Sequence, residues 1–285
     1  MRNNPEYPND AKEVFTACGT CSRTFAHLLN RAFGYPDETA EKAMNLMAGG
    51  ILNQGYQCGM LWGASLAVGA EAYREYEDLD LAVTSAVNAT QHLIASFVDQ
   101  TDTVNCREII GLDLTSKIGM ARFMLRVNSQ GMENSYCFNL AEQWAPQAIE
   151  AGRKGLGDTW DPLQNPRSCA SEVVREMGGT EEEMAMVSGF AGGLGFYGGA
   201  CGALSAAIWK NMLDWCRENP GKDPPYFNNK TAKKILKAFK TETKGEMRCN
   251  KICGRRFLHL NDHTEYLNKG GCSILINLLA HSADA

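Results

Sequence analysis

The sequence has few of the signals that β-sheets require. Runs of β-branched residues that alternate with polar ones are rare, and no Asn-Gly or Asp-Gly pair joins two such runs. Apolar residues instead recur at helical spacing. Helices are expected over residues 21–31, 79–98, 138–151, 203–211, 231–239 and 273–280, and two more are expected after the N-caps Asp37 and Thr180. The sequence therefore predicts an all-α fold.

The sequence gives little indication of a signal peptide or of a membrane span. Its first fifteen residues are polar and contain no apolar core of the kind found in signal peptides. The segments 43–70 and 186–209 carry no charge and are long enough to span a bilayer, but their glycines, and Asn45 and Gln57 in the first, favour a buried core. The net charge of -5 gives no indication of nucleic-acid binding. We expect a cytoplasmic protein without a transmembrane segment.

Cysteine is the residue that this chain has in excess. There are 11 cysteines among 285 residues. A chain of this length does not need disulfides to stabilise its core. In a reducing compartment, cysteines with a function are usually metal ligands or redox catalysts. The cysteines are therefore the first candidates for functional residues.

The two halves of the chain resemble each other at an offset of 143 residues. Residues 48–59 read AGGILNQGYQCG and residues 191–202 read AGGLGFYGGACG, with six of twelve positions identical. At the same offset, CREIIG at 106–111 aligns with CNKICG at 249–254. We therefore predict two homologous units, 1–154 and 155–285, each a bundle of about four or five helices, packed together as a pseudo-dimer.

Eight cysteines form two matched sets when small gaps are allowed. The sets are Cys21, Cys58, Cys106 and Cys137 in the first unit, and Cys169, Cys201, Cys249 and Cys272 in the second. Cys18, Cys216 and Cys253 have no matched partner. Cys216 aligns with Tyr73 and is expected to be dispensable, and Cys253 aligns with Ile110, which suggests an apolar slot.

Each glycine-rich run ends at a cysteine that precedes a helix-like segment. Glycine permits positive φ and a close backbone approach to a ligand, and the free N–H groups of a helix N-terminus stabilise a thiolate. The predicted cofactor-binding residues are Gly49, Gly50, Gly59, Gly192, Gly193 and Gly202. Tight packing between helices is the alternative explanation of these glycines.

Four cysteines per unit match the ligand number of an iron–sulfur cluster or of a structural zinc ion. The long spacings exclude the usual zinc-ribbon and ferredoxin patterns, but they suit ligands that come from several helix ends. We predict both matched sets as metal ligands. The alternative is that each cysteine is a small buried hydrophobic residue.

These motifs resemble the redox-active proteins named for their C-GCAxxG-C-C pattern. The first unit has Cys58-Gly-Met-Leu-Trp-Gly63 and departs at Met60, where alanine is usual, and the second has Cys201-Gly-Ala-Leu-Ser-Ala206 and departs at its last residue. A related domain accompanies haem in the split-Soret cytochrome c. The resemblance implies one cysteine-bound iron–sulfur cluster per unit, exchanging electrons with an unidentified redox partner protein.

Two alternatives remain beside this leading hypothesis. Cysteine pairs within each set could serve a thiol–disulfide redox enzyme or sensor, and zinc could occupy the sets in a structural or interaction protein. Single-unit relatives would pair as homodimers, so a tandem chain could replace that dimer, and a homo-oligomer of this chain is also compatible. The sequence does not decide whether the protein is an enzyme.

Overall fold

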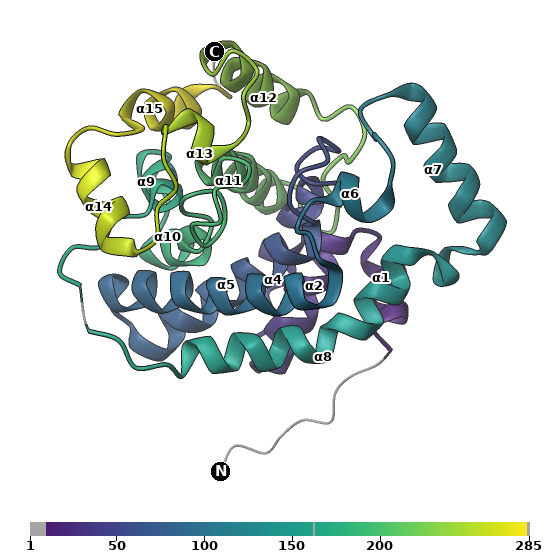
Figure 1. The fold of residues 1–285 in the computed structure, drawn as a ribbon, viewed down its shortest axis with the longest axis horizontal. Helices are drawn as coiled ribbons and strands as arrows, with labels where there is room; N and C mark the ends of the chain where they lie inside the picture. The colour runs from purple at the N-terminus through teal and green to yellow at the C-terminus, as the bar shows by residue number, and fades with distance from the viewer. Residues whose placement is uncertain (1–9, 162, 284–285) are drawn as a thin grey trace.

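The computed structural model describes residues 10–161 and 163–283, and helices dominate this part of the chain (Figure 1). The first half contains α1 (Ala11–Cys18), α2 (Cys21–Ala32), α3 (Glu38–Ala43), η1 (Met44–Met47), α4 (Gly59–Tyr76), α5 (Leu79–Thr101), α6 (Cys106–Ile110), α7 (Lys117–Gln130), η2 (Met132–Asn134) and α8 (Tyr136–Leu156). The second half contains α9 (Cys169–Glu176), α10 (Glu181–Ser188), α11 (Gly202–Glu218), α12 (Lys230–Glu242), α13 (Cys249–Ile252), α14 (Leu260–Asn268) and α15 (Ser273–His281). The all-α prediction is confirmed.

Local sequence explains where several of these helices begin. Asp37 caps α3 by accepting a hydrogen bond from the N–H of Ala40 at 3.0 Å, and Thr180 forms a reciprocal capping box with Glu183 at the start of α10. The expectation of four or five helices per unit was too low. Helices of one or two turns, such as α6 and α13, begin at cysteines and carry too few residues for a visible apolar period.

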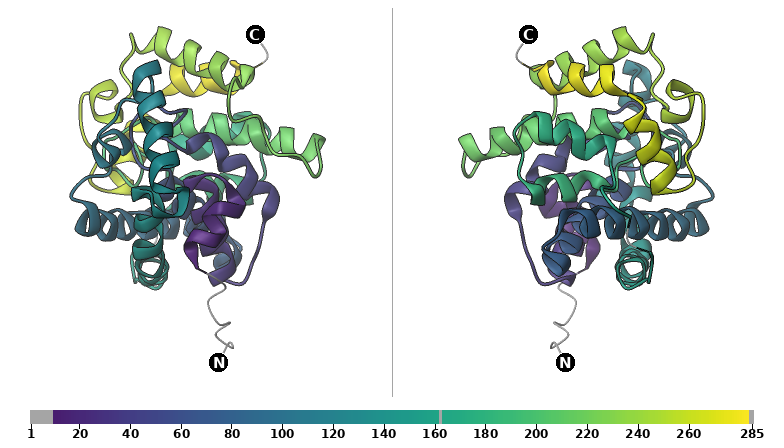
Figure 2. Two further views of the ribbon diagram at one scale, coloured as in Figure 1. Left: turned by 90° about the vertical axis from the view of Figure 1, so that its right-hand side faces the viewer. Right: turned by 90° about the vertical axis from the view of Figure 1, so that its left-hand side faces the viewer.

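The two halves share one hydrophobic core. Within the first half, α4 packs between α2 and α5, and α8 packs on α5. Across the halves, α10 packs on α4 and α5, and α11 packs on α3. Figure 2 shows the purple N-terminal helices at the bottom, the yellow and light green C-terminal helices at the top, and the green α11 between them. None of the helices in the described residues has the length and apolarity needed to cross a membrane.

The glycine-rich runs fold as two copies of one left-handed turn. Residues 49–53 all have φ between 49° and 73°, and residues 192–196 all have φ between 50° and 75°. The hydrogen bonds repeat at the 143-residue offset, since the N–H of Gly55 donates to the carbonyl of Gly49 at 2.9 Å and Gly198 donates to Gly192 at 3.0 Å. A left-handed conformation costs a residue with a side chain about 1–2 kcal/mol. The shared turn is thus a costly feature that both repeats retain.

The repeats meet where one residue contacts its own counterpart. Gln57 is buried, and its side-chain oxygen accepts a hydrogen bond from the N–H of Ala200, its equivalent in the second repeat, at 2.8 Å. Its side-chain nitrogen donates to the carbonyl of Gly193 at 2.8 Å. Contact between equivalent residues is characteristic of a twofold relation. The repeats therefore pack as a pseudo-dimer, as expected.

Buried Glu41 makes the stability of the first repeat depend on pH. Burial alone would raise its pKa, but hydrogen bonds from His27 and Asn30 and the charge of Arg31 lower the pKa to about 2. Because the folded pKa lies below that of the unfolded chain, this stabilisation is complete above pH about 4.5 and is lost as the pH falls toward 2. We expect the wild type to lose about 3 kcal/mol through this group.

Urea unfolding at pH 7 and at pH 3 should show about 2 kcal/mol of this loss, because folded Glu41 is still mostly ionised at pH 3. The Glu41→Gln variant should be less stable than the wild type at pH 7, and the difference should shrink at pH 3. A difference that stays constant over this range would contradict the assignment of the low pKa to Glu41.

Candidate cysteine centres

All eight matched cysteines lie at the N-terminal ends of helices. Cys58, Cys201 and Cys272 are N-caps, Cys21, Cys106, Cys169 and Cys249 are first helical residues, and Cys137 is the second residue of α8. The unmatched cysteines lie elsewhere: Cys18 ends α1, Cys216 lies within α11, and Cys253 is the C-cap of α13. A helix N-terminus presents unpaired N–H groups that favour a thiolate or another anion. The matched cysteines thus share a structural position as well as an alignment.

In the first repeat, each of the four matched cysteines affects the ionisation of another or is affected by it. The thiol of Cys58 hydrogen-bonds to Cys21, and this bond lowers the pKa of Cys21 while it raises that of Cys58. Burial, followed by the charges of Cys21 and Cys137, raises the pKa of Cys106. Burial and the charge of Cys21 raise the pKa of Cys137 to about 12. Each of the four sulfurs is therefore close enough to at least one other to change its ionisation.

The second centre brings its four matched cysteines together in the same way. Burial raises the pKa of Cys169 to about 12 and that of Cys201 to about 11, and the charge of Cys201 contributes to the shift of Cys169. Hydrogen bonding to Cys253 raises the pKa of both Cys249 and Cys272, and the charges of Cys169 and Cys201 add to these shifts.

A fifth cysteine belongs to the second centre. The sulfur of Cys253 lies 3.8 Å from that of Cys249 and 3.7 Å from that of Cys272. Hydrogen bonds from these two thiols lower the pKa of Cys253 to about 3. Cys253 also packs against the apolar cluster that contains Phe257 and Leu260, in line with the apolar slot expected from its alignment with Ile110. The alignment gave no sign of the two thiol contacts, because the first repeat has an apolar cluster at this position, in which Ile110 packs on Leu114.

Three of the predicted glycines face the thiols. The N–H of Gly49 donates a hydrogen bond to the sulfur of Cys21, and the N–H of Gly192 donates to Cys169. A Cβ atom on Gly59 would lie 2.6 Å from the sulfur of Cys21. These positions connect the left-handed turns directly to the cysteine centres.

The other predicted glycines face protein backbone. A Cβ atom on Gly193 would lie 2.5 Å from the carbonyl oxygen of Gly199, and Gly50 is enclosed in the same way by its own turn. Gly202 packs on the backbone of Phe190. Close packing accounts for these three glycines, and their role in binding a cofactor stays a prediction.

Comparison with protein families gives two matches along the chain. The family described as "Putative redox-active protein (C_GCAxxG_C_C)" matches residues 19–150 and 167–284. The chain belongs to this family. Neither the comparison with curated proteins nor the comparison with solved structures found a match.

The C_GCAxxG_C_C matches contain both cysteine centres. The first match includes the four cysteines of the first centre, and the second includes all five cysteines of the second. The protein is thus a tandem member of a redox-active family, with one centre in each repeat. The segment 151–166 between the matches includes the end of α8.

Two tyrosines that the sequence did not single out lie beside the centres. Tyr226 belongs to the second repeat, yet burial and the charges of Cys21 and Cys106 raise its pKa, and its hydroxyl donates to Asn53 at 2.8 Å. Tyr266 lies beside the second centre, where burial and the charges of Cys253 and Cys272 raise its pKa. No sequence motif indicates either tyrosine, because its position beside a cysteine centre depends on tertiary packing.

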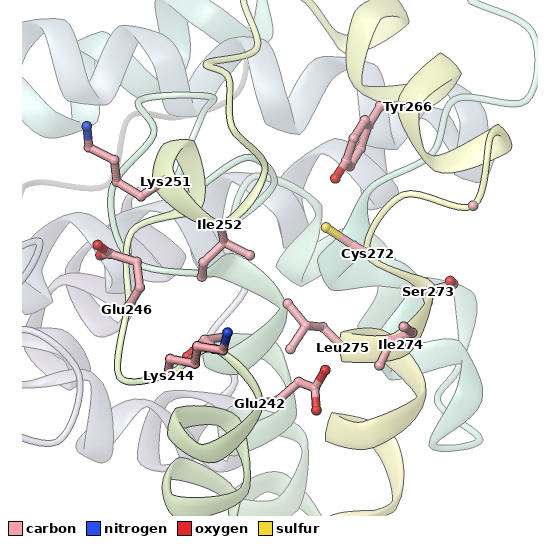
Figure 3. Close-up of a pocket in the computed structure, with 12 residues that line it drawn as sticks. Glu242, Lys244, Glu246, Lys251, Ile252, Tyr266, Cys272, Ser273, Ile274 and Leu275 are labelled. Carbon is pink, nitrogen blue, oxygen red and sulfur yellow. The ribbon is translucent and has the colours of Figure 1, made fainter.

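A pocket of about 420 Å³ reaches the second centre from the surface. Figure 3 shows the sulfur of Cys272 and the hydroxyl of Tyr266 pointing toward each other in this pocket. Lysines and glutamates from α12, the segment after it and α13 line the other walls: Glu242, Lys244, Glu246 and Lys251. The second centre therefore has a polar entrance of mixed charge.

Cys18 and Cys216 lie outside both centres. Burial raises the pKa of each thiol. The charge of Arg23 acts in the opposite direction on the pKa of Cys18, and the charge of Lys42 does so on that of Cys216. Within residues 10–161 and 163–283, no group of three or more His, Cys, Asp or Glu side chains is arranged to hold a metal ion. That the eight matched cysteines bind metal stays a prediction, which measurements of metal content would test.

Proposed function

We propose that each repeat holds an iron–sulfur cluster on its four matched cysteines, and that the protein passes electrons between these centres and a redox partner protein. The ligands would be Cys21, Cys58, Cys106 and Cys137 in the first repeat, and Cys169, Cys201, Cys249 and Cys272 in the second. The observation that carries the proposal is the placement of all eight thiols at helix N-termini, gathered in two groups. When bound, a cluster supplies one-electron redox chemistry.

The donor groups around the sulfurs fit such a cluster. Backbone N–H groups of Gly49 and Ser22 donate to Cys21, and those of Ala203 and Leu204 donate to Cys201. Hydrogen bonds to sulfur and exclusion of solvent are among the factors that set cluster potentials. A cluster with its four thiolates carries negative charge, which the free N–H groups at the N-terminal ends of α2 and α11 would stabilise.

Thiol–disulfide chemistry is the second candidate. The hydrogen bond between Cys21 and Cys58, and the contacts of Cys253 with Cys249 and Cys272, favour it because paired thiols can form a disulfide after a small movement. Under this alternative the protein would exchange two electrons with a dithiol or disulfide partner, without a bound metal.

Composition and spectra of the full chain, purified without oxygen, distinguish these functions. We expect iron and acid-labile sulfide in the protein and visible absorption that fades on reduction. Colourless protein without metal, whose titratable thiols decrease on mild oxidation, would favour the second candidate. Bound zinc without iron or sulfide would assign a structural metal instead, and either result would overturn the cluster proposal.

A further inference from the structure

The position of Cys253 distinguishes the second centre from the first. Cys253 follows Cys249 by one helical turn, and its N–H donates to the carbonyl of Cys249 at 2.8 Å. This spacing places both side chains on the same face of α13. In α6 the equivalent residue is Ile110, which is buried and apolar. The second centre has five thiols where the first has four.

Cys253 has both polar and apolar neighbours. The hydroxyl of Tyr266 hydrogen-bonds to Cys253 and Cys272. Cys253 also packs against the apolar cluster that contains Phe257 and Leu260. The hydroxyl and the two neighbouring thiols are partners that suit a metal ligand or a reactive thiol.

The sulfur separations allow Cys253 to replace a neighbouring ligand. Its sulfur lies within 3.8 Å of Cys249 and 3.7 Å of Cys272. A change of χ1 rotamer moves a cysteine sulfur by about 3 Å, which covers most of the separation between Cys253 and either neighbour. The sulfurs of Cys169 and Cys201 make no such contact with Cys253 in the described chain, so replacement is confined to the side of the centre formed by α13 and α15.

We propose that Cys253 is a fifth, interchangeable ligand of the second centre, which binds the cluster when Cys249 or Cys272 is released. The inference rests on the proposed iron–sulfur function and deepens it. Exchange would free Cys272 at the pocket entrance, next to Tyr266, while the cluster keeps four thiolates. The first repeat has Ile110 in place of Cys253 and so has no spare thiol, and the two centres should differ in their tolerance of ligand loss.

Iron content of cysteine variants of the full chain, purified without oxygen, tests this proposal. Cys249→Ser and Cys272→Ser are expected to keep nearly all the iron of the wild type. Each of them combined with Cys253→Ser should lose about half, because the second centre then has only three thiols. The matched controls are Cys106→Ser and Cys137→Ser, which have no spare thiol and should each lose about half.

Two further readings separate loss of the cluster from loss of the fold. Far-ultraviolet circular dichroism should remain that of a helical protein, and visible circular dichroism should change in Cys272→Ser as the ligand set changes. If Cys249→Ser and Cys272→Ser each lose as much iron as the controls, Cys253 is not an interchangeable ligand, although the cluster proposal stands. Wild-type protein without iron would overturn the proposed function and this inference together.

Discussion

Cys58→Ser is expected to lose about half of the iron of the anaerobically purified wild type, because the first centre would keep only three thiolates. Cys58 caps α4 and contacts Cys21 directly, and no fifth cysteine lies beside the first centre in the described chain. A serine hydroxyl is a harder donor than a thiolate and binds iron–sulfur clusters poorly. Cys201→Ser should lose the same fraction from the second centre, since Cys201 is not among the contacts of Cys253.

Stability should fall together with iron. Metal binding contributes to the free energy of folding because the site is assembled only in the folded chain. Thermal unfolding of Cys58→Ser should therefore begin at a lower temperature than that of the wild type. Cys216→Ser is the control, because Cys216 lies within α11 and outside both centres. Should Cys216→Ser lose iron while Cys58→Ser retains it, the repeat would reflect shared folding and not shared metal chemistry.

The sequence could predict the helices and the internal repeat because both rest on local signals. The expected helix over 21–31 corresponds to α2, and that over 79–98 corresponds to α5. The 143-residue offset appears in the structure as two matching backbone hydrogen-bond patterns. The N–H of Cys58 donates to the carbonyl of Val104 at 2.7 Å, and the N–H of Cys201 donates to the carbonyl of Met247 at 2.8 Å. Identical spacing of glycines and cysteines was enough to reveal this offset.

The left-handed turns could be predicted only in part. Glycine permits positive φ, but Ile51, Leu52 and Leu194 also have φ of 64°, 49° and 68°. Branched and bulky side chains avoid this conformation in isolation. Their side chains are buried or half-buried against the core, and packing of the whole repeat has to hold the backbone there. Such tertiary compensation has no local sequence signal.

The candidate site was predicted better for matched residues than for unmatched ones. Comparison of the repeats selected eight cysteines, and all of them lie at the N-terminal ends of helices. The same comparison discarded Cys253, because it treats a difference between repeats as a lack of function. The proximity of Tyr226 to the first centre also escaped this comparison, since Tyr226 lies 120 residues after Cys106 and 205 after Cys21 in the chain. Divergence between repeats can itself mark a specialised site.

The largest effect on stability outside the cysteines is expected for Gln57→Ala. The amide of Gln57 is fully buried and joins the carbonyl of Gly193 to the N–H of Ala200, each at 2.8 Å. Alanine would leave the N–H of Ala200 buried without a partner, at about 1–3 kcal/mol, and would leave a cavity, while the carbonyl of Gly193 would keep only its 3.2 Å hydrogen bond from the N–H of Gly199. We expect the free energy of unfolding to fall by about 3–5 kcal/mol, measured by urea denaturation.

The control for Gln57→Ala is Gln147→Ala on the surface of α8. The side chain of Gln147 is exposed and donates only to the amide of Gln100, at 3.2 Å, so its removal should change stability by less than about 0.5 kcal/mol. Gln57→Glu is a second test, because a carboxylate can still accept from Ala200 but cannot donate to Gly193. A loss below about 1 kcal/mol in Gln57→Ala would mean that water replaces the amide. The contact between Gln57 and its own counterpart would then not be what joins the repeats, and their shared core alone would hold them together.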